Sequence, residues 1–305
     1  NITGALWSGT QVNIQSGVNI DFAPFIFCEP LIANAGSDQT KCQTLSAVPT
    51  SFTVVGSASN ETDPLWSVLS STGTANATIS TPGSLSSAIA VSGAGTVTLR
   101  LTATSNATPS CGNATDDLVL TVNPLPAAPV VTSPVIYCLN AMAGELTATG
   151  TNLLWYTAST GGTGTTTAPT PSTAAAGNSS YWVSQTNANG CESPRAEIVV
   201  TVNPLPAVPG VTTPVIYCLN ALPSELTATG TSLLWYTTST GGTGSTTAPI
   251  PSTAAAGNTS YWVSQTNANG CESPRAEIVV TVNPLPAIPG VTTPVIYCLN
   301  ALPSE

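Results

Sequence analysis

The chain has 305 residues, a formal charge of −10 at pH 7 and only 6% charged residues, against about 25% in an average globular domain. Four cations and no histidine argue against a surface for nucleic acid or anionic membranes, and they exclude catalytic triads that need an imidazole. The hydrophobic fraction of 42% is enough for apolar cores, so we expect globular domains solvated mainly by uncharged polar side chains.

Residues 1–32 alternate between apolar and polar positions in a strand-like way, but they are too few for a domain of their own. We interpret them as the end of an upstream domain, a cap, or a strand donated to a neighbour. The chain starts with asparagine and shows no signal-peptide pattern, so we expect an export signal to have been removed or to lie outside this sequence. No apolar run reaches the roughly 20 residues that span a bilayer.

Residues 33–123 are predicted to form the first β-sandwich. The run at 65–68 is dense in apolar residues, as in a central strand, and the segments 95–104 and 116–122 read as closing strands. This unit does not match the sequence that follows it.

An 80-residue unit comes next and is repeated. Residues 124–203 form its first copy, residues 204–283 its second, and residues 284–305 begin a third. Segments 123–202 and 203–282 differ at 11 of 80 positions. A period of this length indicates an array of small domains. Arrays supply reach and multivalent contact, so we expect no enzymatic activity.

Each copy is predicted to be all-β. Residues 146–149 alternate, 153–156 form a dense apolar run, 181–185 form another strand, and 195–202 alternate up to the end of the copy. Glycine-rich turns separate these runs, which is typical of a two-sheet sandwich. Trp155 and its counterpart Trp235 are expected in the cores.

The joints between domains are rich in proline. Residues 123–129 read Asn-Pro-Leu-Pro-Ala-Ala-Pro and lead from the last strand of one unit toward the first strand of the next. Proline at this density favours extended, stiff backbone. The predicted architecture is therefore a series of tandem β-sandwich domains that form an elongated rod.

The cysteines recur at fixed places in the repeat, and we expect one disulfide inside each domain, which implies an oxidising, extracellular environment. The expected pairs are Cys42–Cys111, Cys138–Cys191 and Cys218–Cys271. Cys28 and Cys298 have no assigned partner. Zinc is disfavoured because the chain has no histidine and no Cys-x-x-Cys motif.

Several motifs resemble a known family. The runs Pro-Val-Ile-Tyr-Cys at 134–138, Leu-Leu-Trp-Tyr at 153–156 and Gly-Cys-Glu-Ser-Pro-Arg at 190–195 are similar to bacterial Ig-like repeats of large Bacteroidota surface and secreted proteins. The run at 33–40, together with Trp66, resembles PKD-like domains that often accompany them. The resemblance implies export by type IX secretion and an adhesive role, as in gliding-motility adhesins, and it brings no catalytic residues.

Few residues suggest a ligand site. Trp182 and Trp262 each follow a tyrosine on a strand, so one ring of each pair is expected to face outward, where it would contact a sugar ring or the adjacent domain. Clustered oxygens would suit calcium, but only weak candidates exist, and we expect no cofactor. The candidates are Asp38, Asn60, Glu61, Asp63, Asp116 and Asp117.

These observations favour a structural or adhesive stalk segment of a large bacterial cell-surface protein. Its partners would be an extracellular surface, a glycan or neighbouring subunits, with the secretion machinery engaged during export and with neither nucleic acid nor membrane insertion. One alternative is a glycan-binding accessory module of a secreted enzyme. Another is a subunit of a self-assembled extracellular filament completed by residues 1–32 through strand addition.

Overall fold

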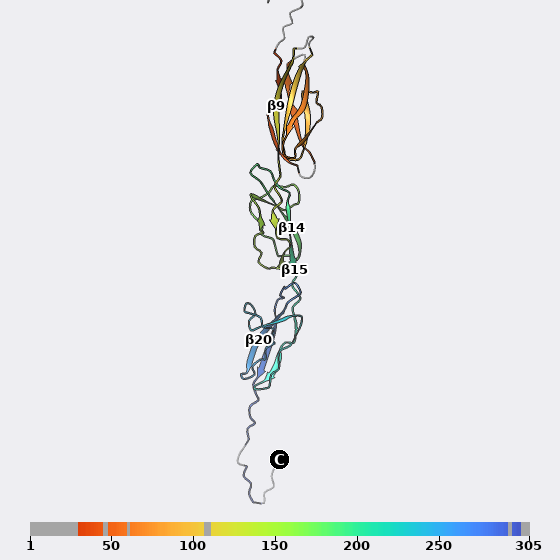
Figure 1. Ribbon diagram of the computed structural model, residues 1–305. Coiled ribbons are helices and arrows are strands. Elements are labelled where there is room, and N and C mark those ends of the chain that lie inside the picture. The colour runs from red at the N-terminus through yellow and green to blue at the C-terminus, as the bar shows by residue number, and fades with distance from the viewer. Residues whose placement is uncertain (1–29, 45–47, 60–61, 107–110, 292–294, 300–305) are drawn as a thin grey trace, which may run out of the picture. The chain divides into compact units, whose positions relative to one another are not determined.

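The computed structural model describes residues 30–44, 48–59, 62–106, 111–291 and 295–299 (Figure 1). Cys28, Asn60 and Glu61 therefore lie outside the described residues, as does nearly all of segment 1–32. All regular structure in the described residues is β-strand, which confirms the predicted all-β class. The chain divides into two compact units, one running to Pro126 with the loop Asn187–Glu192, the other holding the rest from Ala127.

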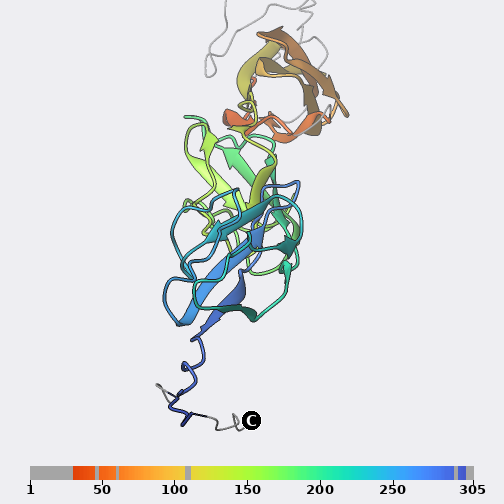
Figure 2. The ribbon, with the colours of Figure 1, turned by 90° about the horizontal axis from the view of Figure 1, so that it is seen from below.

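The first domain is a sandwich of a four-stranded and a three-stranded sheet, with a two-stranded ribbon beside them. The sheet orders are β2-β9-β8-β5, β3-β7-β6 and β1-β4. In Figure 2 the strands of this domain surround its core. The strands are β1 Ala33–Asn34, β2 Gln39–Cys42, β3 Thr50–Val55, β4 Ser57–Ala58, β5 Thr62–Ser71, β6 Asn76–Ile79, β7 Ser86–Ser92, β8 Gly95–Ser105 and β9 Asn113–Asn123.

Alternating side chains build the core of this domain. In β8 every second residue from Val97 to Ala103 is fully buried, because successive side chains of a strand point to opposite faces. Trp66 from β5 and Phe52 from β3 close the core from the two sheets. Arg100, on the outer face of β8, pairs with Asp117 of β9 at 2.7 Å.

The two repeats have the same strand arrangement. Each combines a four-stranded sheet, β11-β15-β14-β13 or β17-β21-β20-β19, with a two-stranded ribbon, β10-β12 or β16-β18. The first repeat contains β10 Val130–Val131, β11 Val135–Cys138, β12 Ala148–Thr149, β13 Leu153–Tyr156, β14 Gly177–Gln185 and β15 Ala196–Asn203. The second contains β16 Gly210–Val211, β17 Val215–Cys218, β18 Ala228–Thr229, β19 Leu233–Tyr236, β20 Gly257–Gln265 and β21 Ala276–Asn283.

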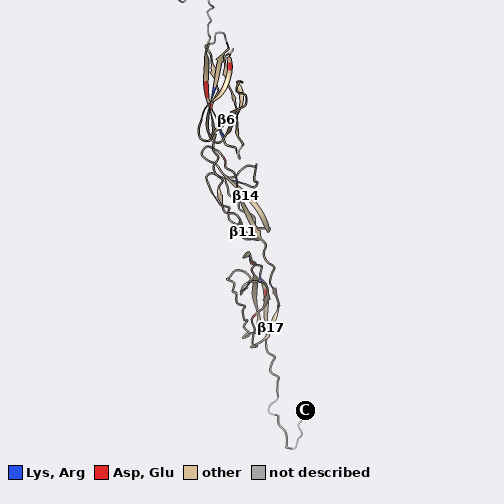
Figure 3. Cartoon of the chain, turned by 45° about the vertical axis from the view of Figure 1, so that its right-hand side comes forward, with Lys and Arg blue, Asp and Glu red and all other residues tan. Residues whose placement is uncertain are grey.

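The repeat cores lie where the sequence predicts them. Trp155 and Trp235 are 4% and 5% exposed and pack against the apolar face of the last two strands of their domains. The strand predicted at 146–149 forms only at Ala148–Thr149, where it pairs with the short β10. Figure 3 shows long stretches of both repeats without charged residues.

One feature is common to all three domains. In each domain, the first strand of the four-stranded sheet pairs in parallel with the last strand of the domain. The other pairings within the sandwich sheets are antiparallel. The parallel pair ends each time with a cysteine opposite an asparagine, and the proline-rich linker starts directly after that asparagine. The pairs are Cys42 with Asn123, Cys138 with Asn203 and Cys218 with Asn283.

Candidate functional site

The two cysteines of a repeat lie at opposite ends of its last strand. Cys218 stands opposite Asn283, the final residue of β21, whereas Cys271 precedes Ala276, the first residue of that strand. Eight residues of strand span about 25 Å. A disulfide requires Cα atoms within about 7 Å, so Cys218 and Cys271 are too far apart to pair within the repeat.

The disulfides run between consecutive domains instead. Cys42, at the end of β2, is bonded to Cys191, and Cys138, at the end of β11, is bonded to Cys271 of the second repeat. Both bonds have a Cα–Cα distance of 5.5 Å. The predicted pairs Cys42–Cys111, Cys138–Cys191 and Cys218–Cys271 are therefore wrong, because regular spacing in a repeat does not reveal which end of the domain each cysteine occupies.

The remaining described cysteines fit the same scheme. Cys111, in the loop before the last strand of the first domain, is also disulfide-bonded. Cys218 and Cys298 are free and exposed. Cys218 was expected in a disulfide and is not in one. The pairs Cys42–Cys191 and Cys138–Cys271 each join one strand-end cysteine to one loop cysteine.

A self-bonded turn holds the loop cysteine. The Asn267 side-chain oxygen accepts hydrogen bonds from the backbone N–H of Asn269 and of Cys271, both at 3.0 Å. Gly270 completes the turn with a φ of 78°, a conformation that favours glycine. Cys271 is thereby fully buried. The same bonds recur around Asn187 in the first repeat.

The turn also grips the linker. The Asn267 side-chain amide donates to the carbonyl of Pro204 at 3.1 Å, and Gln265 donates to the carbonyl of Ala207 at 2.7 Å. Asn187 makes the equivalent bond to Pro124 at 3.0 Å. Pro204 directly follows Asn203, the partner of Cys138. Each joint therefore combines a covalent bond with a hydrogen-bonded linker, and we name this arrangement the stapled joint.

A second cluster fastens the glycine-rich loop of each repeat. The Arg195 guanidinium lies 3.3 Å from the centroid of the Tyr156 ring and donates to the carbonyls of Ala158 and Gly161. In the second repeat Arg275 lies 3.2 Å from the Tyr236 ring centroid. This cation–π contact, together with the bonds to backbone carbonyls, fastens a loop that consists of small residues only.

The hydroxyl groups of Tyr236 and Ser264 both donate to Glu272, at 2.6 and 2.5 Å. Burial, and next the bond to Glu272, raise the pKa of Tyr236. Burial alone would raise the pKa of Glu272, but the hydrogen bonds from Ser264 and Tyr236 outweigh it and lower that pKa. Trp182 and Trp262 are half-buried in the same sheets, opposite Tyr156 and Tyr236 in the register.

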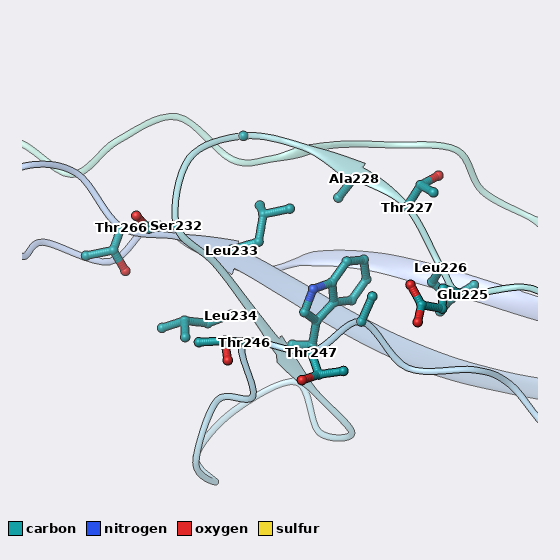
Figure 4. A pocket seen from close by; sticks show the side chains of 13 residues that line it. Glu225, Leu226, Thr227, Ala228, Ser232, Leu233, Leu234, Thr246, Thr247 and Thr266 are labelled. Carbon is teal, nitrogen blue, oxygen red and sulfur yellow. The ribbon is translucent and has the colours of Figure 1, made fainter.

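Each repeat also contains an open groove. In the second repeat the groove has a volume of about 900 Å³, with Glu225 and Leu226 at one end and Ser232 and Thr266 at the other (Figure 4). The matching groove of the first repeat, about 750 Å³, includes Glu145. Threonines and leucines line both, and the tryptophan at the base belongs to the core. The groove was not predicted, because it arises from the gap between a short ribbon and the edge of the sheet.

A comparison with protein-family models now identifies the repeats. The model for the Ig-like domain, CHU_C associated, matches residues 126–204 and 206–284. The chain belongs to this family. No curated protein matches it.

Solved structures are similar to the CHU_C-associated Ig-like chain at low sequence identity. The I67–I69 fragment of titin is 14% identical, with a TM-score of 0.37, and the match covers 85% of this chain and 100% of the fragment. A variant of the same titin fragment gives 14%, 0.38, 84% and 99%. A Bacteroides ovatus protein, SGBP-B in complex with a mixed-linkage heptasaccharide, gives 13%, 0.19, 82% and 67%.

Three of the weak calcium candidates have other roles in the structure, whereas Asp63 is exposed on β5. Asp38 accepts from the backbone N–H of Val119, Asp116 from that of Ala35, and Asp117 pairs with Arg100. These bonds fix β1, β2 and β8 against β9. Among the described residues no three His, Cys, Asp or Glu side chains form a group suited to a metal ion. Within the same residues no helix has the length and hydropathy of a membrane span.

Proposed function

We propose that these CHU_C-associated Ig-like domains form a load-bearing stalk segment of a bacterial cell-surface protein, with a structural rather than a catalytic role. Disulfide-bonded Ig-like domains are typical of extracellular proteins. The observation that carries the proposal is the stapled joint. A disulfide within a domain protects only that domain, whereas one between domains makes neighbours bear tension together.

The disulfides of the two stapled joints, Cys42–Cys191 and Cys138–Cys271, which we call the first and second staple, overlap along the sequence. Cys138 lies between Cys42 and Cys191, and Cys191 lies between Cys138 and Cys271. Through these two disulfides alone, the covalent path from Cys42 to Cys271 contains only the 53 residues from 138 to 191, in place of the 229 from 42 to 271. If one staple is lost, the other still limits the extension.

Single-molecule stretching of the full chain with Cys111→Ser, held by its ends, tests this role, because the substitution removes the further disulfide of Cys111 from the covalent path. The variant Cys138→Ser/Cys271→Ser lacks the Cys138–Cys271 disulfide. Its covalent path runs through Cys42–Cys191 and then along the 80 residues from 191 to 271. The path grows by 27 residues, so the fully extended length should increase by about 90 Å. Independent staples within domains would release 53 residues, about 180 Å.

Full reduction supplies the second reading, because it should release the whole 229-residue segment, an increase of about 600 Å over the oxidised chain. A Cys218→Ser/Cys298→Ser variant is the matched control, since both thiols are free, and it should stretch like the parent chain. An unchanged length after loss of the second staple would contradict the proposal.

Adhesion along the array is a second candidate role, favoured by the recurrence of the same groove in both repeats. We propose a glycan as its ligand, because threonine hydroxyls and a carboxylate line the groove together with leucine side chains. Parallel Thr247→Trp and Thr167→Trp variants, which fill the grooves, should abolish retention of the full chain on the polysaccharide it binds. A Trp182→Ala/Trp262→Ala variant distinguishes glycan binding in the grooves from glycan binding on the sheet face that carries these two tryptophans.

The finer expectations belong to the same proposal. Export by type IX secretion, a gliding-type adhesin and assembly into filaments are consistent with the family and with extracellular disulfides. The strand proposed for donation lies within segment 1–32, which is nearly all outside the described residues.

A further inference from the structure

The strand end around Cys218 has the same parts as two stapled joints but carries no staple. Cys42 and Cys138 occupy the equivalent position in the two preceding domains, and each is bonded to a loop cysteine of the following domain. The strand end is already formed, since Leu219 donates to the carbonyl of Asn283 at 2.9 Å as Leu139 does to Asn203 at 2.8 Å. The two formed joints differ from this strand end by the cysteine-bearing loop of the following domain.

Residues that the stapled joint covers at the end of the first repeat are more exposed at the equivalent end of the second repeat. Cys138, Asn203 and Leu205 are half-buried, whereas Cys218 and Asn283 are exposed and Leu285 is 56% exposed. A residue on the same strand outside the joint shows no such change. Ile136 is 58% exposed and its counterpart Ile216 is 61% exposed. The extra exposure in the second repeat is therefore confined to the joint surface.

We infer that Cys218, with Asn283 and Leu285, forms a covalent docking site for the Asn-Ala-Asn-Gly-Cys loop of a further copy of this repeat. The loop cysteine would bond to Cys218, and the loop asparagine would donate to the carbonyl of Pro284, as Asn267 does to Pro204. The inference rests on the joint geometry and holds whether or not the chain bears load.

Formation of the bond is an oxidation. The two thiols lose two protons and two electrons as the S–S bond forms, and a disulfide oxidant such as oxidised glutathione takes them up and becomes two thiols. We expect the docking site around Cys218 to determine which two thiols react. Cys298 is also free and exposed, but in the repeat it is another strand-end cysteine, and it would compete only if proximity alone selected the pair.

The test uses the full chain extended by a copy of residues 226–283, which completes the copy that begins at 284–305. After oxidation in a glutathione buffer, free thiols are alkylated and the modified residues are located by peptic digestion and mass spectrometry. We expect Cys218 to be linked to the added loop cysteine and almost completely protected from alkylation, and Cys298 to become fully alkylated.

Two controls separate the surface from chance pairing. An extended chain with serine in place of the added loop cysteine should leave Cys218 fully alkylated. Alanine in place of the added loop asparagine should slow the linkage about tenfold, because two hydrogen bonds inside the turn and one to the linker are lost. A link from the added cysteine to Cys298, or a Cys218 that stays free while the added loop cysteine is bonded elsewhere or alkylated, would overturn the inference. Neither result bears on the stretching of the 42–271 segment.

Discussion

At the scale of single residues, a hydrogen-bonded carboxylate and a buried phenol couple the second repeat to pH. Glu272 accepts two hydroxyl hydrogen bonds, and Tyr236 is 7% exposed beneath Arg275. The pKa of Glu272 is lowered from its ordinary value of 4.5. The ionised form therefore stabilises the fold above that value, and the stabilisation is lost as the pH falls through the lower folded-state pKa.

The matching effect at high pH has the opposite sign. The pKa of Tyr236 is raised above its ordinary value of 10.0, mainly by burial, so its neutral form stabilises the fold below that value and less so as the pH rises through the folded-state pKa. We predict that calorimetric melting temperatures of the full chain fall below pH 4.5 and above pH 10. Glu272→Gln should flatten the acid limb and, because the bond to Glu272 also raises the pKa of Tyr236, weaken the alkaline limb to a smaller extent. Glu277→Gln, exposed on β21, should leave both limbs unchanged, and an unaltered acid limb in Glu272→Gln would refute the assignment.

At the scale of elements, the last strand, its loop and the linker act together. Much of this was readable from the sequence. The runs at 153–156, 181–185 and 195–202 become β13, part of β14 and most of β15, because their apolar alternation is long enough to dictate a face. The two-residue strand at Val130–Val131 and the parallel strand at Val135–Cys138 were not predicted, since so few residues carry no periodicity.

The stapled joint shows the limit of such reasoning most clearly. The sequence identifies every cysteine and both neighbouring motifs, but pairing depends on the end of a strand at which each one lies. Only the register of β17 on β21, with Cys218 opposite Asn283, reveals this. The clamp formed by Arg195 on Tyr156 escaped prediction for the same reason, because 39 positions of sequence separate two residues in ring contact.

Loss of the loop asparagine should weaken the staple next to it. Asn267→Ala removes two bonds inside the turn and one to Pro204, so the loop should open more often, by about 1–2 kcal/mol. We expect dithiothreitol to reduce Cys138–Cys271 about tenfold faster while Cys42–Cys191 keeps its rate. Asn187→Ala should give the reverse pattern, and equal rates at both bonds in either variant would contradict this role.

The glycine-rich loops offer a second test of an element. Arg195→Lys keeps the charge but loses the planar contact with Tyr156 and the paired bonds to the loop carbonyls. Limited proteolysis with elastase should cleave the loop of the first repeat about tenfold faster and leave that of the second repeat unchanged. Arg275→Lys is the matched variant in the other repeat. Slow cleavage in both would show that the backbone alone holds the loops.

At the scale of the whole molecule, the linkers and staples should restrict bending between domains. The elongated rod remains a prediction, based on the proline-rich linkers and now also on the stapled joints. Small-angle scattering should give a maximum dimension near that of three domains end to end, independent of protein concentration. Mild reduction should broaden the distribution of distances without loss of the individual folds, because each core is formed by its own domain. A compact particle in the oxidised state would contradict this picture.

The division of the Cys138–Cys271 joint between two copies of the repeat has a genetic consequence. One copy contributes the strand-end cysteine and linker, and the next contributes the asparagine turn with its cysteine. Both halves are encoded in every 80-residue unit, so recombination that inserts or removes whole units rebuilds a complete joint at the crossover. The length of such a protein can thus change between generations while every junction in it stays chemically the same.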